Sequence, residues 1–210
     1  MPCDLLIDGA LVVTLDAQDR LIAEGAVAVI GDRIVAVEPA RVARRRFAPR
    51  RRIDARGGIV MPGLVNTHNH TPLVITRGMV EDLGYAPMYT PRVPQGYRLS
   101  AEEAYLLSRL GALELLRFGS TTVCDNYRHP EACARAMSET GLRAFVGGRV
   151  HDADPAALAR GEWRYDRGIG EATLQENLDL VARWDGHDAG RIRCFVAPHA
   201  PDTCSRELLA

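Results

Sequence analysis

The sequence contains no lysine, because all 26 of its basic residues are arginine. A Schiff-base lysine, a lysine general base and a metal ligand derived from lysine are therefore excluded within this chain. The sequence also lacks any apolar run near the ~20 residues that a membrane-spanning helix needs, and it lacks the basic start and apolar core of a signal peptide. Its net charge of −1 gives no global field that would draw the chain to nucleic acid or to a membrane.

Cysteine pairs of the CxxC type are also absent, since the five cysteines are scattered along the chain. Because the sequence has neither a signal peptide nor a membrane span, we expect a cytoplasmic location, and in that compartment scattered cysteines are expected to be free thiols. Cys124 and Cys194 lie inside apolar runs and are expected to be small core residues.

Residues 1–57 are expected to form a β-rich N-terminal segment. Apolar and β-branched runs at 5–7, 11–14, 26–30 and 33–37 indicate short strands, with turn signals at Asp8-Gly9 and Gly31-Asp32. The pattern is typical of a β-meander or of part of a small β-sandwich.

Eight arginines lie between residues 41 and 56. They could form a patch for nucleic acid or a solvated connector between strands. We favour the connector because the net charge of the chain is close to zero, and we expect no nucleic-acid partner.

Residues 58–210 alternate between strand and helix patterns, which indicates βα units around a parallel sheet. Strands are predicted at 59–67, 120–126, 143–150 and 192–197, with a polar loop over 152–170. A (β/α)8 barrel takes about 250 residues, so these units amount to about half of one. The segment is therefore either a small open sheet or the N-terminal half of a TIM-type barrel.

Local signals mark the helices between these strands. Ser100 is the expected N-cap of one helix, with Glu103 completing a capping box, and a second helix runs from Pro130 to Gly141. The first helix is expected to bury a face formed by Leu106, Leu110 and Leu113. A later helix is expected to bury Leu174, Leu178 and Val181.

The tripeptide His68-Asn69-His70 ends the first predicted strand of this region. Two histidines at i and i+2 on a strand point to the same face, and imidazole is the commonest metal ligand. The carboxyl end of a strand is where the chemistry of βα-barrels is found. The sequence therefore predicts that His68 and His70 bind a metal ion.

Four motifs together resemble the amidohydrolase superfamily, in the branch of adenosylhomocysteine/methylthioadenosine deaminases, guanine-type deaminases and triazine hydrolases. The first is the strand-one sequence VMPGLVNTHNH at 60–70. The others are RGMVEDL at 77–83, GSTTV at 119–123 and APHAPDTCS at 197–205. Residues 4–7 and 31–37 resemble the start of the small β-sandwich of that family.

This resemblance implies hydrolytic deamination of a heterocyclic amine (a purine, pterin or triazine-like ring) by a metal-bound hydroxide. It implies that His199 contacts the substrate, and that the third metal histidine, a catalytic glutamate and further ligands lie on later strands. No catalytic residue is therefore assigned within this chain. Strand four has no lysine to bridge two metals, which favours one divalent ion; Zn²⁺ suits histidine and carboxylate ligands, and Fe²⁺ also fits them.

Two alternatives to the deaminase interpretation remain. One is a chlorohydrolase or N-dealkylating hydrolase of the same family, and the other is that residues 1–210 are a catalytically incomplete fragment. The resemblance also implies a homo-oligomer at full length.

The long loop after the first strand is expected to form a lid or a pocket wall. In nucleoside-using members of the family a glutamate after a Pro-x pair grips the ribose, whereas Val93-Pro94-Gln95-Gly96 places glycine there. This departure favours a bare heteroaromatic ring as the substrate. The loop residues singled out as possible pocket residues are Glu81, Asp82, Tyr85, Met88, Tyr89, Gln95 and Tyr97.

The remaining candidates are weaker. His129 and His187 fit surface turns, beside Pro130 and Gly186. Arg149 and His151 follow the third predicted strand and lie on the rim where they could reach a pocket.

Overall fold

A break at Met61-Pro62-Gly63 divides the first predicted strand of the barrel region. The computed structural model has β5 (Ile59–Val60), which pairs with β1, and β6 (Leu64–Asn69), which begins a different sheet. The prediction of one strand over 59–67 is therefore wrong, because Pro62 has no N–H to donate to a sheet. The chain divides into units Met1–Gly63 and Leu64–Ala210, whereas the sequence suggested a boundary after residue 57.

The structure describes residues 1–79, 99–158 and 160–210. In these ranges no helix combines the length and the apolar character needed to span a bilayer.

The first unit is a five-stranded mixed sheet. Its strands lie in the order β3-β2-β1-β4, and β5 also pairs with β1. A turn was predicted at Asp8-Gly9, but β1 continues through it with a register shift, and Gly9 has a φ of +85°. Glycine adopts this conformation without the steric penalty of a side chain, so Asp8-Gly9 marks a bulge. The elements are β1 (Pro2–Val13), β2 (Leu21–Ile30), β3 (Arg33–Pro39), α1 (Ala40–Arg46) and β4 (Ala48–Asp54).

The arginines of the segment 41–56 are all exposed, as the prediction of a solvated connector expects, but the segment also contains a strand, β4, which that prediction did not include. The segment forms α1 and β4, because Ala40, Ala43 and Phe47 pack into a core under the sheet and β4 pairs in parallel with β1. The buried carboxylate of Asp8 accepts hydrogen bonds from Arg44, at 2.9 Å, and from Arg52. These arginines thus hold the helix and the strand onto β1.

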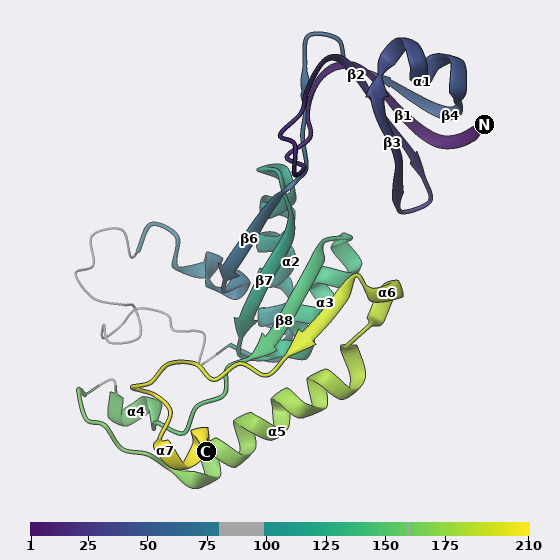
Figure 1. Cartoon of the computed structure of the whole chain (residues 1–210). Coiled ribbons are helices and arrows are strands. Elements are labelled where there is room, and N and C mark those ends of the chain that lie inside the picture. Colours follow the sequence, from purple (N-terminus) through teal and green to yellow (C-terminus); the bar gives the residue numbers. More distant parts are fainter. Residues whose placement is uncertain (80–98, 159) are drawn as a thin grey trace. The chain divides into compact units, whose positions relative to one another are not determined.

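The second unit is a four-stranded parallel sheet in chain order, β6-β7-β8-β9, so all carboxyl ends lie at one edge (Figure 1). The later strands are β7 (Ser120–Tyr127), β8 (Arg143–Gly148) and β9 (Ile192–Phe195). The helices between them are η1 (Thr71–Thr76), α2 (Ala101–Arg117), α3 (Pro130–Thr140), α4 (Pro155–Leu158), α5 (Arg167–Trp184) and α6 (His187–Gly190), and α7 (Arg206–Leu209) follows β9. This order places the chemistry expected of βα units at the edge where the strands end.

The core of the second unit lies between the sheet and its helices. Val123, Ala144 and Val146 alternate toward this side of the strands and pack with Met137 of α3 and Leu180 of α5. Because side chains alternate along a strand, the intervening residues, such as Phe145, lie on the opposite face and are more exposed.

The capping box of α2 is confirmed, since Ser100 accepts a hydrogen bond from the Glu103 N–H and the Glu103 carboxylate accepts one from Ser100. The predicted buried leucine stripe is wrong. In the described structure Leu106, Leu110 and Leu113 are 54%, 47% and 53% exposed.

The face of α2 that is buried consists mainly of small residues. A Cβ added to Gly111 would lie 3.0 Å from the Thr71 carbonyl oxygen, so this helix packs closely against η1. Such close packing selects Ala, Ser and Gly over leucine. Ala104, Ser108 and Ala112 are buried on the same helix.

The expected loop over 152–170 contains helical residues, which corrects that prediction. It contains α4 and the start of α5, whose N-cap Asp166 accepts hydrogen bonds from the N–H groups of Gly168 and Ile169. On α5 Leu178 is 44% exposed, while Asn177 and Leu180 are fully buried. The predicted end of the second helix is confirmed, because α3 ends at Gly141 in a left-handed conformation. Ser205 is the N-cap of α7.

Candidate active site at the carboxyl edge of the parallel sheet

Five side chains form a continuous row across the ends of the four parallel strands. The rings of His68 and His70 lie 4.8 Å apart, and the ring of His70 lies 5.1 Å from that of Tyr127. The Arg149 guanidinium lies 5.5 Å from the centre of the Tyr127 ring, and its Nη2 is 3.4 Å from Nδ1 of His199. The structure thus brings the predicted residues His68, His70 and His199 to one edge.

His70 is oriented by a backbone group of the neighbouring strand. Its Nδ1 lies 2.6 Å from the carbonyl oxygen of Asn126. A carbonyl oxygen only accepts hydrogen bonds, so Nδ1 carries the hydrogen and the lone pair of Nε2 is available to a metal ion. Burial lowers the pKa of His70 to about 4, so the ring is neutral at neutral pH, as a metal ligand must be.

The backbone at His68 departs from a regular strand. The pairing of β6 with β7 shifts between Asn66 and Asn69, so that β6 has one more residue than its partner over this stretch. Such bulges re-aim side chains and are common beside active sites.

A buried carboxylate holds the residue that follows His70. Asp125 accepts a hydrogen bond from the Thr71 N–H at 2.7 Å and another from the Thr71 hydroxyl at 2.8 Å. Burial raises the pKa of Asp125 to about 6, against the effect of the two Thr71 bonds. The Thr71 hydroxyl also lies 3.1 Å from that of Ser108 on α2.

His199 is fixed through its backbone and through Nδ1. Its N–H donates to the Val150 carbonyl at 2.9 Å, and its Nδ1 lies 2.7 Å from Oγ1 of Thr203. Nη2 of Arg149 lies 3.4 Å from the same nitrogen, and the Thr203 hydroxyl also donates to the Ala200 carbonyl at 3.1 Å, so Nδ1 has protein partners and Nε2 is the nitrogen left for a ligand. Burial, and then the charge of Arg149, lowers the pKa of His199 to about 3, which keeps the ring neutral.

Asn177 of α5 holds the chain just before His199. Its Nδ2 donates to the Phe195 carbonyl at 3.0 Å, and its Oδ1 accepts from the Ala197 N–H at 3.0 Å. Glycine at 148 makes room for this side chain, because an added Cβ would lie 3.1 Å from Cγ of Asn177.

Sequence reasoning missed Tyr127, Asp125 and Asn177. A signal for two of them was present, since Asp125 is a charged residue within a predicted strand and Asn177 falls beside the apolar residues of a helix. Polar residues at such positions are buried only when they are hydrogen-bonded.

The weaker histidine candidates have local partners. His129 has its Nε2 2.7 Å from the Leu99 carbonyl, and the His187 side chain is half exposed. His151 is buried, with its Nδ1 3.0 Å from the Arg149 carbonyl and its backbone N–H bonded to Thr173.

His68 and His70 are the candidate metal ligands that the sequence predicted at this edge. Among the described residues no group of three or more His, Cys, Asp or Glu side chains is arranged to hold a metal. The orientation of His70 nevertheless fits the role of a ligand. The predicted loop residues lie outside the described residues, and these are Glu81, Asp82, Tyr85, Met88, Tyr89, Gln95, Gly96 and Tyr97.

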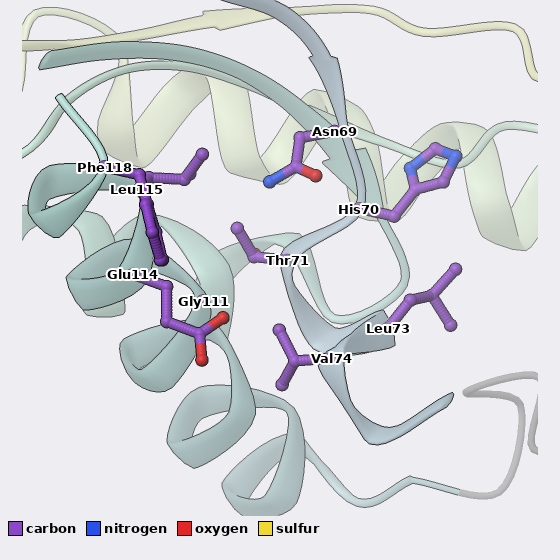
Figure 2. Close-up of a pocket in the computed structure, with 9 residues that line it drawn as sticks. All are labelled: Asn69, His70, Thr71, Leu73, Val74, Gly111, Glu114, Leu115 and Phe118. Atoms are coloured by element: carbon purple, nitrogen blue, oxygen red, sulfur yellow. The ribbon is translucent and has the colours of Figure 1, made fainter. Parts of the chain in front are cut away.

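A cavity of about 350 Å³ lies between the end of β6, η1 and α2. Figure 2 shows that the His70 ring lies on the opposite side of the chain from Glu114 of α2 and from Phe118, the residue after that helix. His70 therefore borders this cavity, but its ring is directed away from the helix side of it.

Comparisons with known proteins identify relatives over nearly the whole chain. The chain is 33% identical over 207 residues to a 5-methylthioadenosine/S-adenosylhomocysteine deaminase of Pelotomaculum thermopropionicum, covering 98% of this chain and 45% of that protein. It is 34% identical over 208 residues to a 5'-deoxyadenosine deaminase of Methanosarcina mazei, covering 99% and 45%. The chain thus spans about 45% of the length of these relatives.

A solved structure agrees with these relatives. It is described as an adenosine deaminase from Xanthomonas campestris with bound zinc, is 32% identical, and superposes with a TM-score of 0.79 over 99% of this chain and 45% of that one. The parallel sheet with its helices is part of the (β/α)8 barrel of such proteins. The model of the amidohydrolase family matches residues 59–210. The chain therefore belongs to the amidohydrolase family.

Proposed function

We propose that the protein is a metal-dependent hydrolase that deaminates a small heterocyclic amine. The observation that carries this proposal is the row from His68 to His199 at the carboxyl edge, in which His70 has its Nε2 lone pair available. The relatives, which are described as deaminases, and the bound zinc of the Xanthomonas structure support it.

His68 and His70 are the residues proposed to hold one divalent metal ion, with zinc as the first candidate and iron as the second. The ion lowers the pKa of a bound water toward neutrality, and this is the chemistry it supplies. The Asn126 carbonyl keeps the hydrogen of His70 on Nδ1, and burial keeps the ring neutral. Both effects favour metal binding at neutral pH.

His199 is proposed to bind the substrate through its Nε2. Arg149 and Thr203 hold Nδ1, so the opposite ring nitrogen is the one left to form a hydrogen bond with the substrate. A neutral imidazole in a partly buried site suits an uncharged heteroaromatic ring. We assign no proton-transfer role to a residue of this chain.

Ammonia release is the reaction to measure, with the intact protein loaded with zinc. The panel compares adenosine-type nucleosides with bare amino-substituted rings, because the relatives are named for nucleosides while Gly96 departs from the nucleoside pattern. We expect ammonia from at least one compound, with activity abolished by His70→Ala and KM raised by His199→Gln. Release of halide or alkylamine from substituted triazines without ammonia from any compound would overturn the deaminase proposal.

The cytoplasmic location and the homo-oligomeric state also stay proposals. Cell fractionation and light scattering of the intact protein test them directly.

A further inference from the structure

Strand β7 contacts the end of β6 on both sides of the His70 α-carbon. On one side the Asn126 carbonyl bonds the imidazole of His70. On the other side the carboxylate of Asp125 bonds both donors of Thr71, its N–H and its hydroxyl. Two consecutive residues of β7 thus fix the ring of His70 and the peptide that follows it.

The two donors of Thr71, its N–H and its hydroxyl, need two acceptor atoms at one place. A carboxylate offers two acceptor oxygens, whereas an asparagine amide offers one acceptor and one donor group. The Asn69–Asp125 pair is also the last of the ladder between β6 and β7, so no later ladder pair holds Thr71. Asp125 therefore holds the backbone of the residue after His70, where the pairing between β6 and β7 has ended.

The partner of Asp125 sets it apart from a similarly buried carboxylate, Asp152, which holds the N–H and hydroxyl of Ser205, whereas Asp125 holds those of the residue next to His70. Asp125 is fully buried, and in the described parts of the chain it forms no ion pair with an arginine or histidine. Burying a carboxylate without a counter-ion is unfavourable, even when it is hydrogen-bonded.

We propose that Asp125 is a positioning residue for the metal site, which holds the Thr71 backbone so that Nε2 of His70 is directed at the metal ion. This inference rests on the proposed function, because it takes His70 as a metal ligand. Asp125 acts through Thr71 and touches neither the metal nor the substrate.

The test is the zinc affinity of the intact protein, measured by competition with a chromophoric chelator. Asp125→Asn should weaken zinc binding by about 10- to 100-fold, the range found when outer-shell partners of metal ligands are removed. Asp152→Asn is the matched control. Asp152 is also a buried carboxylate that accepts bonds from one residue's N–H and hydroxyl, those of Ser205, and its removal should leave the zinc affinity within about twofold of wild type.

A second pair of variants tests the same idea if Asp125→Asn does not fold. Thr71→Val removes one donor to Asp125 and should weaken zinc binding, whereas Thr71→Ser keeps both donors and should restore it. The visible spectrum of the Co²⁺-substituted protein should shift in Thr71→Val and in Asp125→Asn, but not in Asp152→Asn.

The outcomes separate this inference from the proposed function. If His70→Ala binds zinc as well as wild type does, the metal site itself is wrong and both proposals fall. If His70→Ala loses zinc while Asp125→Asn and Thr71→Val match the Asp152→Asn control, the metal site stands and the positioning role of Asp125 is refuted.

Discussion

Replacing Asn177 should loosen the segment that carries His199. Asn177→Ala removes its hydrogen bonds to the Phe195 carbonyl and to the Ala197 N–H. The Ala197 N–H then lacks its acceptor, although this residue is only 5% exposed. Two lost hydrogen bonds and one unsatisfied buried group together cost about 3 kcal/mol. At about 2–4 °C per kcal/mol for a chain of this size, Tm should fall by about 6–12 °C.

Asn177→Asp gives the same test a pH dependence. The carboxylate can still accept from Ala197, but its second oxygen faces the Phe195 carbonyl unless it is protonated. Burial raises the pKa of such a carboxyl above its unfolded value of about 4. The stability of the variant is therefore full below about pH 4 and is lost as the pH rises through the folded pKa.

Urea unfolding at several pH values measures both effects. Asn177→Leu is the control, because it has no titratable group at position 177 and shares every other pH dependence of the protein. KM should also rise in Asn177→Ala, because His199 follows the segment that Asn177 holds. A loss below about 0.5 kcal/mol in Asn177→Ala, within the range of an ordinary surface substitution, would contradict the proposed role of Asn177. So would an Asn177→Asp variant whose stability follows the same pH profile as that of Asn177→Leu.

Three further substitutions test other parts of the structure. Gly111→Ala should destabilise the protein by about 1–3 kcal/mol in urea unfolding, because the 3.0 Å approach of its Cβ to the Thr71 carbonyl outweighs a gain of about 1 kcal/mol in helix propensity. Asp8→Asn should cost about 1–3 kcal/mol in the same assay by weakening the bonds from its two arginines, and an unchanged midpoint would contradict this. Below pH 6.5 the unfolded chain protonates His199 while the folded chain, with a pKa of about 3, does not, so stability is full above pH 6.5 and falls with pH. His199→Gln should make the loss of stability between pH 6.5 and 4 less steep, by at most about 1.4 kcal/mol per pH unit. The effect should be smaller than this limit because the ring is partly exposed. An identical pH slope in wild type and His199→Gln would count against a buried neutral ring.

Local chemistry made several features predictable from the sequence. The Ser100 capping box depends on residues three apart, and the end of α3 depends on Gly141, so both can be recognised without knowing the fold. The His68-Asn69-His70 motif is equally local, and the structure places both rings together.

Features that depend on distant packing were not predictable. The leucines of α2 were expected to be buried because they are large and apolar, but the close approach of α2 to η1 selects Gly111 and its small neighbours. The partnership of Asp125 with Thr71 joins residues 54 apart in the sequence, and it exists only because β6 and β7 pair. The periodicity of apolar residues predicts which face of a helix could be buried. The distance between two packed elements decides which side-chain sizes fit between them.

The zinc content and zinc affinity of wild type, His68→Ala and His70→Ala test the central claim most directly. The exposed His187 provides the matched control, since His187→Ala removes a histidine outside the row at the carboxyl edge. The account predicts one zinc ion per chain in wild type and in His187→Ala, and loss of that ion in His68→Ala and in His70→Ala. Full zinc retention, at wild-type affinity, in both His68→Ala and His70→Ala would contradict it.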